Sequence, residues 1–212
     1  MMRPRAFLLL AMVALVAVAA LAAAEWSGTA PPADGTSDWL VVTDTTVTGE
    51  EVSTSGDIRV MPGSQLTLLG ASLLFTGDDD PSITVERGAS LVMEDSTIPA
   101  TDGTWYTFHV RGSATIAESD ISGTMGGIQA HSDDLIIRGS HIHHGLGPGV
   151  ELWGHDATIS GCVIDNVDIG ISSVAMNDDL EDSVALIDGW SVTLSDTTLS
   201  AKTYGMYLYW KK

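Results

Sequence analysis

The stretch from Gly127 to Gly170 reads GIQAHSDDLIIRGSHIHHGLGPGVELWGHDATISGCVIDNVDIG and contains two consecutive copies of one pattern. Each copy opens on Gly-Ile or Gly-Val, alternates apolar and polar residues, turns and alternates again. A similar opening returns at Gly170 and at Gly205, so successive openings are 22, 21 and 35 residues apart. Self-similarity of this kind is typical of repeat architectures, in which each unit buries its apolar face against the next unit.

Short segments of alternating apolar and polar residues recur on both sides of this stretch at matching positions. One set comprises residues 58–60, 83–85, 108–110, 128–130, 150–152, 171–173 and 206–208. A second set comprises residues 66–68, 91–93, 114–116, 135–137, 157–159 and 192–194. Five residues after each segment of the second set the chain is apolar again, at Leu73, Ile98, Ile121, Ile142, Ile164 and Leu199. Alternation of this kind is typical of half-buried strands and predicts three short strands per repeat.

Such strands can bury one face only by stacking on the next repeat, so we predict an all-β fold, a parallel β-helix. At the usual strand spacing of about 4.8 Å, about six to seven coils would give a rod of about 30 Å. Residues 39–42 and 46–48 are expected to form a first, capping layer. The 35-residue spacing predicts a loop insertion at residues 177–189. Ser173 interrupts an inward apolar column, so either it is tolerated there or a bulge turns Val174 inward.

The repeat has the form G-I-x-A/L followed by L/A-x-I-x-x-S/C-x-I, every 21 to 25 residues between Ile58 and Trp210. It resembles the parallel β-helix repeat of the pectin-lyase-like superfamily and is closest in style to the NosD-like and surface-layer-associated β-helices. The resemblance implies a right-handed, single-stranded solenoid. It does not fix an activity, because this fold carries lyases, hydrolases, adhesins and inert spacers.

The chain echoes two sequence blocks of the polygalacturonases of this superfamily, at Asp133-Asp134 and at Gly154-His155-Asp156. Their Asn-Thr-Asp and Arg-Ile-Lys blocks are absent from the sequence. The superfamily's lyases use an arginine or lysine base beside calcium-binding acids, and no such motif is found in the chain. Neither activity is therefore carried over.

Residues 1–24 predict export. Two arginines precede an apolar run over residues 6–24 that ends on three alanines, a pattern typical of a secretory signal peptide. The run is also nearly long enough for an uncleaved membrane anchor that tethers the protein. Either alternative places the rest of the chain outside the cytoplasm, secreted or at the cell surface. Residues 25–38, rich in Gly, Pro, Ser and Thr, predict a flexible linker, and residues 39–212 the β-helix domain.

The chain ends shortly after a new repeat begins. The segment from Gly205 to Trp210 starts another coil without a second strand, a third strand or a polar cap. An open apolar end promotes association with other chains. We therefore expect that the domain is incomplete here, and that the natural protein continues past Lys212 or a partner covers this end.

Residues 25–212 carry all 28 acidic residues and seven of the nine basic ones, a net charge of −21. This excess keeps a protein soluble and repels polyanions. Nucleic acid and anionic lipid surfaces are excluded as expected partners, because both require a basic footprint. The charge also suits a salty medium, where screening removes most self-repulsion. The single cysteine, Cys162, excludes an internal disulfide and falls on an apolar repeat position, so we expect it to be buried.

The turn before the second strand carries acidic residues and a histidine in two successive repeats. Stacking places Asp133 and Asp134 about 5 Å from His155 and Asp156 of the next coil. Two carboxylates at that separation suit a retaining glycosidase or a Ca²⁺ site of oxygen ligands. Solvated turn residues are the structural alternative. The candidate catalytic residues are Asp133, Asp134, His155 and Asp156.

Aromatic and imidazole side chains on outward positions offer flat surfaces for sugar rings. Coverage of the last coil is the alternative explanation for the tyrosines. In the same outward column we expect an ion pair between Glu86 and Arg111. The candidate substrate-binding residues are His131, Trp153, Tyr207 and Tyr209.

The third strand of one repeat carries His141 and His143 on either side of an inward isoleucine, so both histidines face outward. Asp120 is expected one coil below His141, and Asp165 one coil above His143. Two such His–Asp ladders could bind a metal or tune a general base. Hydrogen bonds between surface ladders are the simpler explanation. His144 at the bend adds a further ligand option.

These patterns lead to three hypotheses. The first is an extracytoplasmic β-helix module that binds a polysaccharide or another cell-surface component, or serves as a structural scaffold, without catalysis. The second is a polysaccharide hydrolase or lyase that uses the Asp/His turn. The third, taken from the NosD resemblance, is metal handling by His141 and His143. Calcium is the cofactor that the carboxylate clusters would accept.

Overall fold

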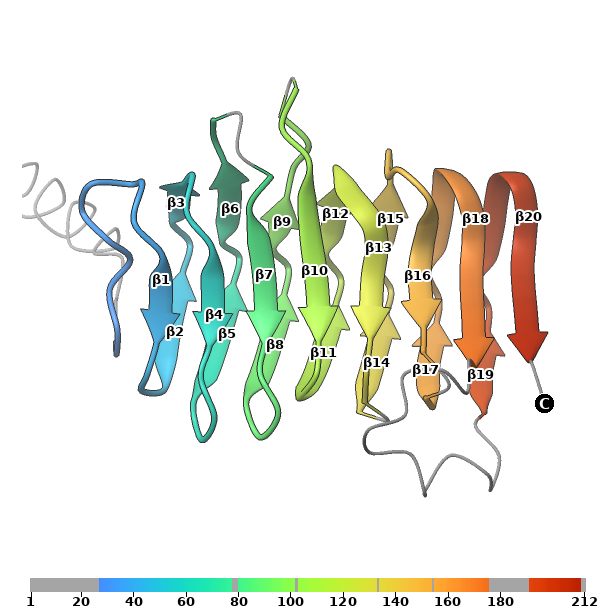
Figure 1. The fold of residues 1–212 in the computed structure, drawn as a ribbon, viewed down its shortest axis with the longest axis horizontal. Coiled ribbons are helices and arrows are strands. Elements are labelled where there is room, and N and C mark those ends of the chain that lie inside the picture. Colours follow the sequence, from blue (N-terminus) through green and yellow to red (C-terminus); the bar gives the residue numbers. More distant parts are fainter. Residues whose placement is uncertain are drawn as a thin grey trace, which may run out of the picture.

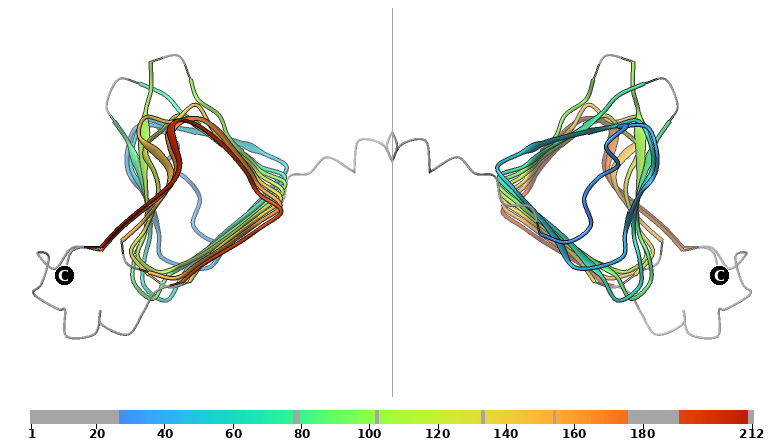
Figure 2. Two further views of the ribbon diagram at one scale, coloured as in Figure 1. Left: turned by 90° about the vertical axis from the view of Figure 1, so that its right-hand side faces the viewer. Right: turned by 90° about the vertical axis from the view of Figure 1, so that its left-hand side faces the viewer.

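The computed structural model describes residues 27–77, 80–101, 103–132, 134–153, 155–175 and 191–210. In these residues the chain is all-β and winds into a parallel solenoid of about six turns (Figure 1). Each coil is roughly triangular in cross-section (Figure 2). The two figures together show the chain turning anticlockwise as it approaches a viewer at the C-terminal end. The solenoid is therefore right-handed, as predicted.

The three sides of the triangle are called faces A, B and C. Face A contains β1 (Trp39–Val41), β4 (Ile58–Val60), β7 (Ser82–Val85), β10 (Tyr106–Val110), β13 (Thr124–Ala130) and β16 (Pro148–Leu152). Face B contains β2 (Thr45–Thr48), β5 (Gln65–Leu69), β8 (Ser90–Glu94), β11 (Ser113–Ala117), β14 (Leu135–Arg138), β17 (Ala157–Ser160) and β19 (Val192–Ser195). Face C contains β3 (Glu51–Thr54), β6 (Ser72–Phe75), β9 (Thr97–Ile98), β12 (Asp120–Ser122) and β15 (His141–His143).

Two long strands turn the corner from face C to face A. They are β18 (Val163–Ala175) and β20 (Thr198–Trp210), and they pair with each other in parallel with two register shifts. Because β18 pairs with β15 by its first half and with β16 by its second half, faces A and C form one 13-stranded sheet. Face B is a separate 7-stranded sheet.

The predicted stacking register is confirmed in all three columns. On face C, for example, Ile121 pairs with Ile142 and Ile142 with Ile164, and all three side chains are fully buried. The aliphatic core consists of these inward columns. One strand was missed: β3 completes the first coil, where the sequence predicted two segments only. Cys162 is buried, as expected, and its thiol contacts the Ser160 carbonyl oxygen.

Three of the opening glycines, Gly127, Gly149 and Gly170, are required by the close approach of successive coils. Gly127 has a φ of +74°, and a Cβ atom there would overlap the backbone oxygens of Pro148 and Gly149 in the next coil. A Cβ atom at Gly149 would meet the side chain of Ile164. In these Gly-Ile and Gly-Val pairs, a position with no room for a side chain therefore comes directly before a side chain that enters the core.

The ends of the domain are only partly described. The export segment at residues 1–24 and the predicted insertion at residues 177–189 lie outside the described residues. Within the part of the chain that is described, no helix is long and apolar enough to cross a membrane. Part of the predicted linker packs on the first coil, where the Trp39 indole N–H donates to the Thr29 carbonyl oxygen at 2.9 Å. The last coil exposes apolar side chains at Tyr204, Met206, Tyr207, Leu208 and Tyr209.

Ser173 keeps its place in the inward column. It pairs with Leu152 on one side and Leu208 on the other, and its side chain is completely buried. Its Oγ atom has no hydrogen-bond partner among the described residues. A buried hydroxyl without a partner lowers stability, because it loses its hydrogen bonds to water.

We predict that Ser173→Ala raises the free energy of unfolding by about 1 kcal/mol, since it removes the unpaired hydroxyl and leaves little empty space. Urea unfolding of the full chain, followed by circular dichroism, measures the change. Ser160→Ala, at an outward position, should change stability by less than about 0.5 kcal/mol. A loss of stability in Ser173→Ala would show that the hydroxyl has a partner.

Candidate functional site

Most of the predicted site residues lie on two separate parts of the surface, and Tyr207 and Tyr209 lie apart from both. One group lines a groove at the corner between faces A and B, together with the adjoining edge of face A. The other group lies on the outside of face C. The two groups come from different strands of the same coils. They therefore lie at similar positions along the solenoid axis but on different sides of the solenoid.

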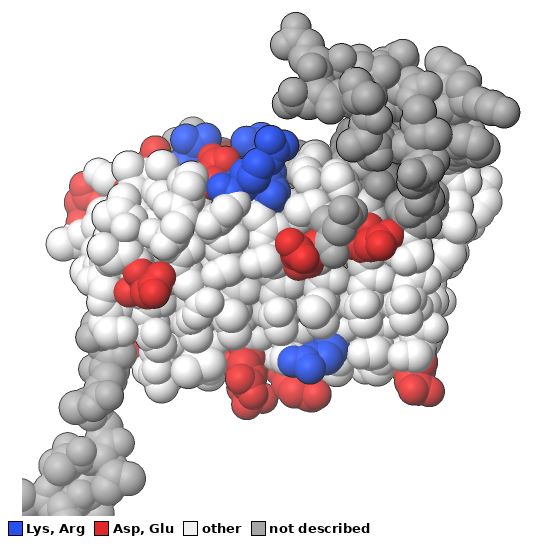
Figure 3. Space-filling model, turned by 90° about the horizontal axis from the view of Figure 1, so that it is seen from below, with Lys and Arg blue, Asp and Glu red and all other residues white. Residues whose placement is uncertain are grey.

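The groove crosses six successive turns between faces A and B and has a volume of about 690 Å³. Polar turn residues and glycines form its walls. Its lining residues are Asp44, Gly63, Ser64, Gln65, Arg87, Gly88, Ala89, Ser90, Arg111, Gly112, Ser113, His131, Ser132, Asp134 and His155. Figure 3 looks onto this side of the solenoid, where basic side chains gather near one edge and acidic ones are spread over the surface.

The candidate catalytic residues are only partly brought together. Asp134 and His155 line the same groove, and Asp134 and Asp156 both line a second hollow of about 360 Å³ over face B. Asp133 lies outside the described residues. Asp156 also has a structural contact, because its carboxylate accepts a hydrogen bond from the backbone N–H of Ser191 in the next coil.

The same contact recurs at the other end of the solenoid. The Asp44 carboxylate accepts a hydrogen bond from the Gln65 backbone N–H at 3.0 Å. An aspartate before a face B strand can therefore pair with the backbone of the following coil and help to fix its position. This use of the side chain explains part of the acidic pattern that the sequence shows at these turns.

The outward residues His131 and Trp153 form a stacked pair. Their ring centroids are 5.5 Å apart with an interplanar angle of 15°, and His109 lies on the other side of His131 at 5.9 Å. The predicted pair of Glu86 and Arg111 is confirmed at 3.6 Å. Of this pair, His131 also lines the groove.

Burial changes the ionisation of this part of face A. It lowers the pKa of His131 to about 4, with smaller contributions from the positive charges of His109, Arg111 and His155. The pKa of His109 is also lowered, mainly by burial. Burial raises the pKa of the Glu151 carboxyl. At neutral pH His131 is therefore neutral and presents an uncharged ring.

Tyr207 and Tyr209 are not in contact with this pair. Both lie on β20, where their rings are parallel with centroids 6.5 Å apart. Tyr209 belongs to the outward column of Trp153, but the coil that carries Val174 lies between them. The tyrosines therefore form a separate aromatic strip on the last described coil.

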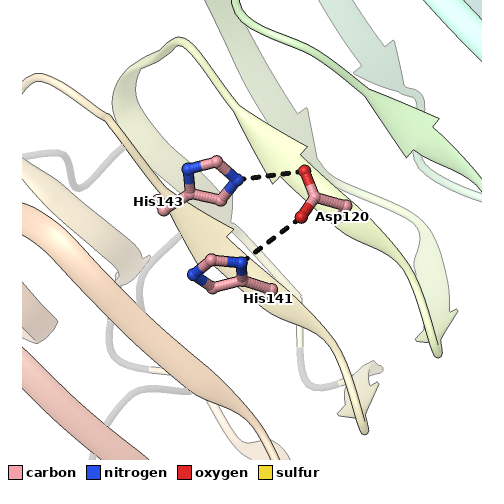
Figure 4. Close-up of side chains that lie close together, drawn as sticks. All are labelled: Asp120, His141 and His143. Carbon is pink, nitrogen blue, oxygen red and sulfur yellow. Dashed lines mark hydrogen bonds and ion pairs between the residues drawn. The ribbon is translucent and has the colours of Figure 1, made fainter.

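The predicted His–Asp ladders on face C are present (Figure 4). Asp120 pairs in register with His141, and His143 pairs with Asp165. The side chains make different contacts from those that the register alone suggests. The Asp120 carboxylate bridges both imidazoles, with Oδ1 3.0 Å from His143 Nε2 and Oδ2 3.3 Å from His141 Nδ1. Asp165 lies on the far side of His141, with Oδ2 3.3 Å from Nε2.

Two further features complete this cluster. The rings of His141 and His143 are stacked, with centroids 4.1 Å apart. His144 has a φ of +52° and turns back, so that its Nδ1 atom contacts Nδ1 of His143. The sequence could not place His144, because a histidine in the left-handed region is decided by the turn and not by the strand alternation.

Comparisons with family models, with curated proteins and with solved structures found no match for the chain. The class of protein is therefore defined by the fold itself. It is a parallel β-solenoid with a polar groove along one corner and a histidine–carboxylate cluster on another face.

The lowered pKa of His131 predicts a specific pH dependence. In the unfolded chain a histidine titrates at about pH 6.5, so between about pH 6.5 and 4 the unfolded state binds a proton that the folded state does not. The free energy of unfolding should therefore fall as the pH is lowered through this window. Urea midpoints measured from pH 7 to pH 4 should fall less in His131→Gln than in the unmodified chain.

An NMR titration of the imidazole protons checks the same shift directly, with an expected midpoint for His131 of about 4. A midpoint close to 6.5, or equal pH slopes for the two proteins, would contradict the proposed cause.

Proposed function

We propose that the chain is an extracytoplasmic β-helix module that binds a neutral polysaccharide along its groove without catalysing a reaction. The observation that carries this proposal is the continuous groove across six successive turns. We also propose that the chain is related to the non-catalytic surface proteins of the pectin-lyase-like superfamily. Location outside the cytoplasm rests on the sequence of residues 1–24.

The shape of the groove favours a long ligand. Strands of adjacent coils lie about 4.8 Å apart, so six turns extend over about 24 Å. Each turn contributes its own polar residues, for example Gln65, Ser90, Ser113 and Asp134. A row of hydrogen-bonding groups at a short, regular spacing matches an extended polymer of similar units better than it matches a compact metabolite.

The adjoining face of His131 and Trp153 suits a sugar ring. Stacking against flat rings and hydrogen bonding to polar neighbours is how amphipathic ligands bind to aromatic side chains. His131 is neutral at neutral pH because of its lowered pKa, so it supports the Trp153 ring without adding a charge. His131 lines the groove and Trp153 stacks on it, so a bound chain in the groove would pass beside the pair.

The charge of the molecule favours a neutral ligand. Residues 25–212 have a net charge of −21, which repels acidic polysaccharides at a distance. The basic side chains near the groove do not reverse this, because Glu86 contacts both Arg59 and Arg111, at 3.8 and 3.6 Å. The structural contact of Asp156 supports binding without catalysis, since a carboxylate engaged by Ser191 is less available as a base or nucleophile.

Trp153→Ala should weaken binding of the full chain to a neutral polysaccharide by about tenfold, because it removes the stacking surface. Affinity electrophoresis against soluble glucans, mannans and galactans, with polyuronates for comparison, measures the change. Trp105→Ala removes another half-buried tryptophan far from the groove and should leave binding unchanged. Failure of folded protein to bind any of these polymers would contradict the proposal.

The same mixtures should contain no new reducing ends and no unsaturated products. Product that forms with the unmodified chain and is lost in Asp134→Asn, with folding intact, would replace the binding proposal with the catalytic alternative.

A further inference from the structure

We propose that face C binds one divalent first-row transition-metal ion, with Asp120, His141 and His143 as its protein ligands. The ligand atoms of these three residues all lie within 4.8 Å of one another. They come from neighbouring strands β12 and β15 and point toward one another (Figure 4). The site lies on a different face from the groove, so each can exist without the other.

Two of the distances between the donor atoms are close to those of a coordination site, and all three ligand atoms lie within 4.8 Å of one another. In a tetrahedral site with bonds of about 2.0–2.2 Å, neighbouring ligand atoms lie about 3.3 Å apart. His143 Nε2 and His141 Nδ1 are 3.0 and 3.3 Å from the oxygens of the Asp120 carboxylate. An ion between the three side chains therefore needs little movement of the strands, which hydrogen bonding to the adjacent coils holds in place.

The second nitrogen of each histidine also has the expected neighbour. Metal-bound histidines in proteins almost always donate their other ring N–H to a carboxylate or another acceptor. With Nδ1 of His141 on the ion, its Nε2 atom lies 3.3 Å from Asp165 Oδ2, an ion-pair contact without hydrogen-bond alignment among the described residues. With Nε2 of His143 on the ion, its Nδ1–H faces the Nδ1 acceptor of His144. Asp165 and His144 therefore orient the ligands and do not bind the ion themselves.

This arrangement is difficult to explain with neutral histidines alone. Both nitrogens of His141 face a carboxylate, and a neutral imidazole carries only one N–H. One nitrogen would then point its lone pair at a negatively charged oxygen. An ion bound at Nδ1 removes this repulsion, because Nδ1 and Asp120 both become ligands and only the Nε2 side is left to Asp165, 3.3 Å away. Surface ion pairs without a metal are the competing explanation, and they predict no binding of metal.

The chemistry of the ligands selects the class of ion. Imidazole nitrogens suit zinc, copper, nickel and iron, whereas calcium and magnesium take oxygen ligands. The Asp120 and His141 side chains are 44% and 40% exposed, so water or a further ligand can fill the remaining positions. Copper(II) and zinc(II) are suitable probes, since divalent copper has the highest affinity for a given nitrogen and oxygen site.

The test is a calorimetric titration of the full chain with Zn²⁺ and with Cu²⁺, together with electron paramagnetic resonance of the Cu²⁺ complex. We expect one ion per chain with two coordinated nitrogens. The double variant His141→Ala, His143→Ala should lose this binding and its nitrogen signature. Asp165→Asn should weaken binding by about 10- to 100-fold, as expected for a carboxylate that orients a ligand.

Two variants control for general effects. His109→Ala removes a half-buried histidine from face A, and Asp168→Asn removes a carboxylate on β18 that faces Lys202 instead. Both should bind the metal as the unmodified chain does. Circular dichroism establishes that each variant is folded. Absence of binding to the folded unmodified chain, or equal binding by the folded double variant, would overturn the proposal and leave surface ion pairs without a metal as the explanation.

Discussion

The structure depends on the in-register stacking of aliphatic side chains inside the solenoid. Each coil contacts only the coils before and after it, so Ile121, Ile142 and Ile164 and their equivalents on the other faces are buried by their neighbours in the column. Full burial of such a side chain contributes about 1.5–3 kcal/mol. A shift of one residue in any strand would turn its apolar side chains outward, so the packing of the core also specifies the register.

This constraint has a direct consequence for the outer surface. Once the inward residues are fixed, the residues between them must form ladders on the outside, one rung per coil. The contact of Asp120 with His141 and the stacking of His131 on Trp153 both arise in this way. At the corners the residues are constrained by the close approach of the backbones of successive coils. Gly127 leaves room for the backbone of the next coil, and Asp156 holds the next coil through a hydrogen bond.

The two polar regions differ in their electrostatics. Along the groove, partial burial keeps His131 neutral, and the lining carries charges of both signs, from Arg87 and Arg111 and from Asp44 and Asp134. On face C, carboxylates flank imidazoles on a more exposed surface. The two proposed ligands differ accordingly: an uncharged polymer at the groove and a cation on face C.

The sequence by itself determined the columns, their register and the neighbours of each outward residue, because alternation with a period of two and a regular repeat length leave one way to bury the apolar side chains. It therefore predicted that Asp120 lies beside His141 and Asp165 beside His143. The tertiary structure decided which side chains meet: Asp120 reaches both histidines, Asp165 contacts His141, and His144 turns back. Rotamers, turn conformations and burial depend on residues from three coils at once, and no repeat pattern encodes them. For the same reason the third strand of the first coil and the backbone contact of Asp156 became visible only in the folded chain.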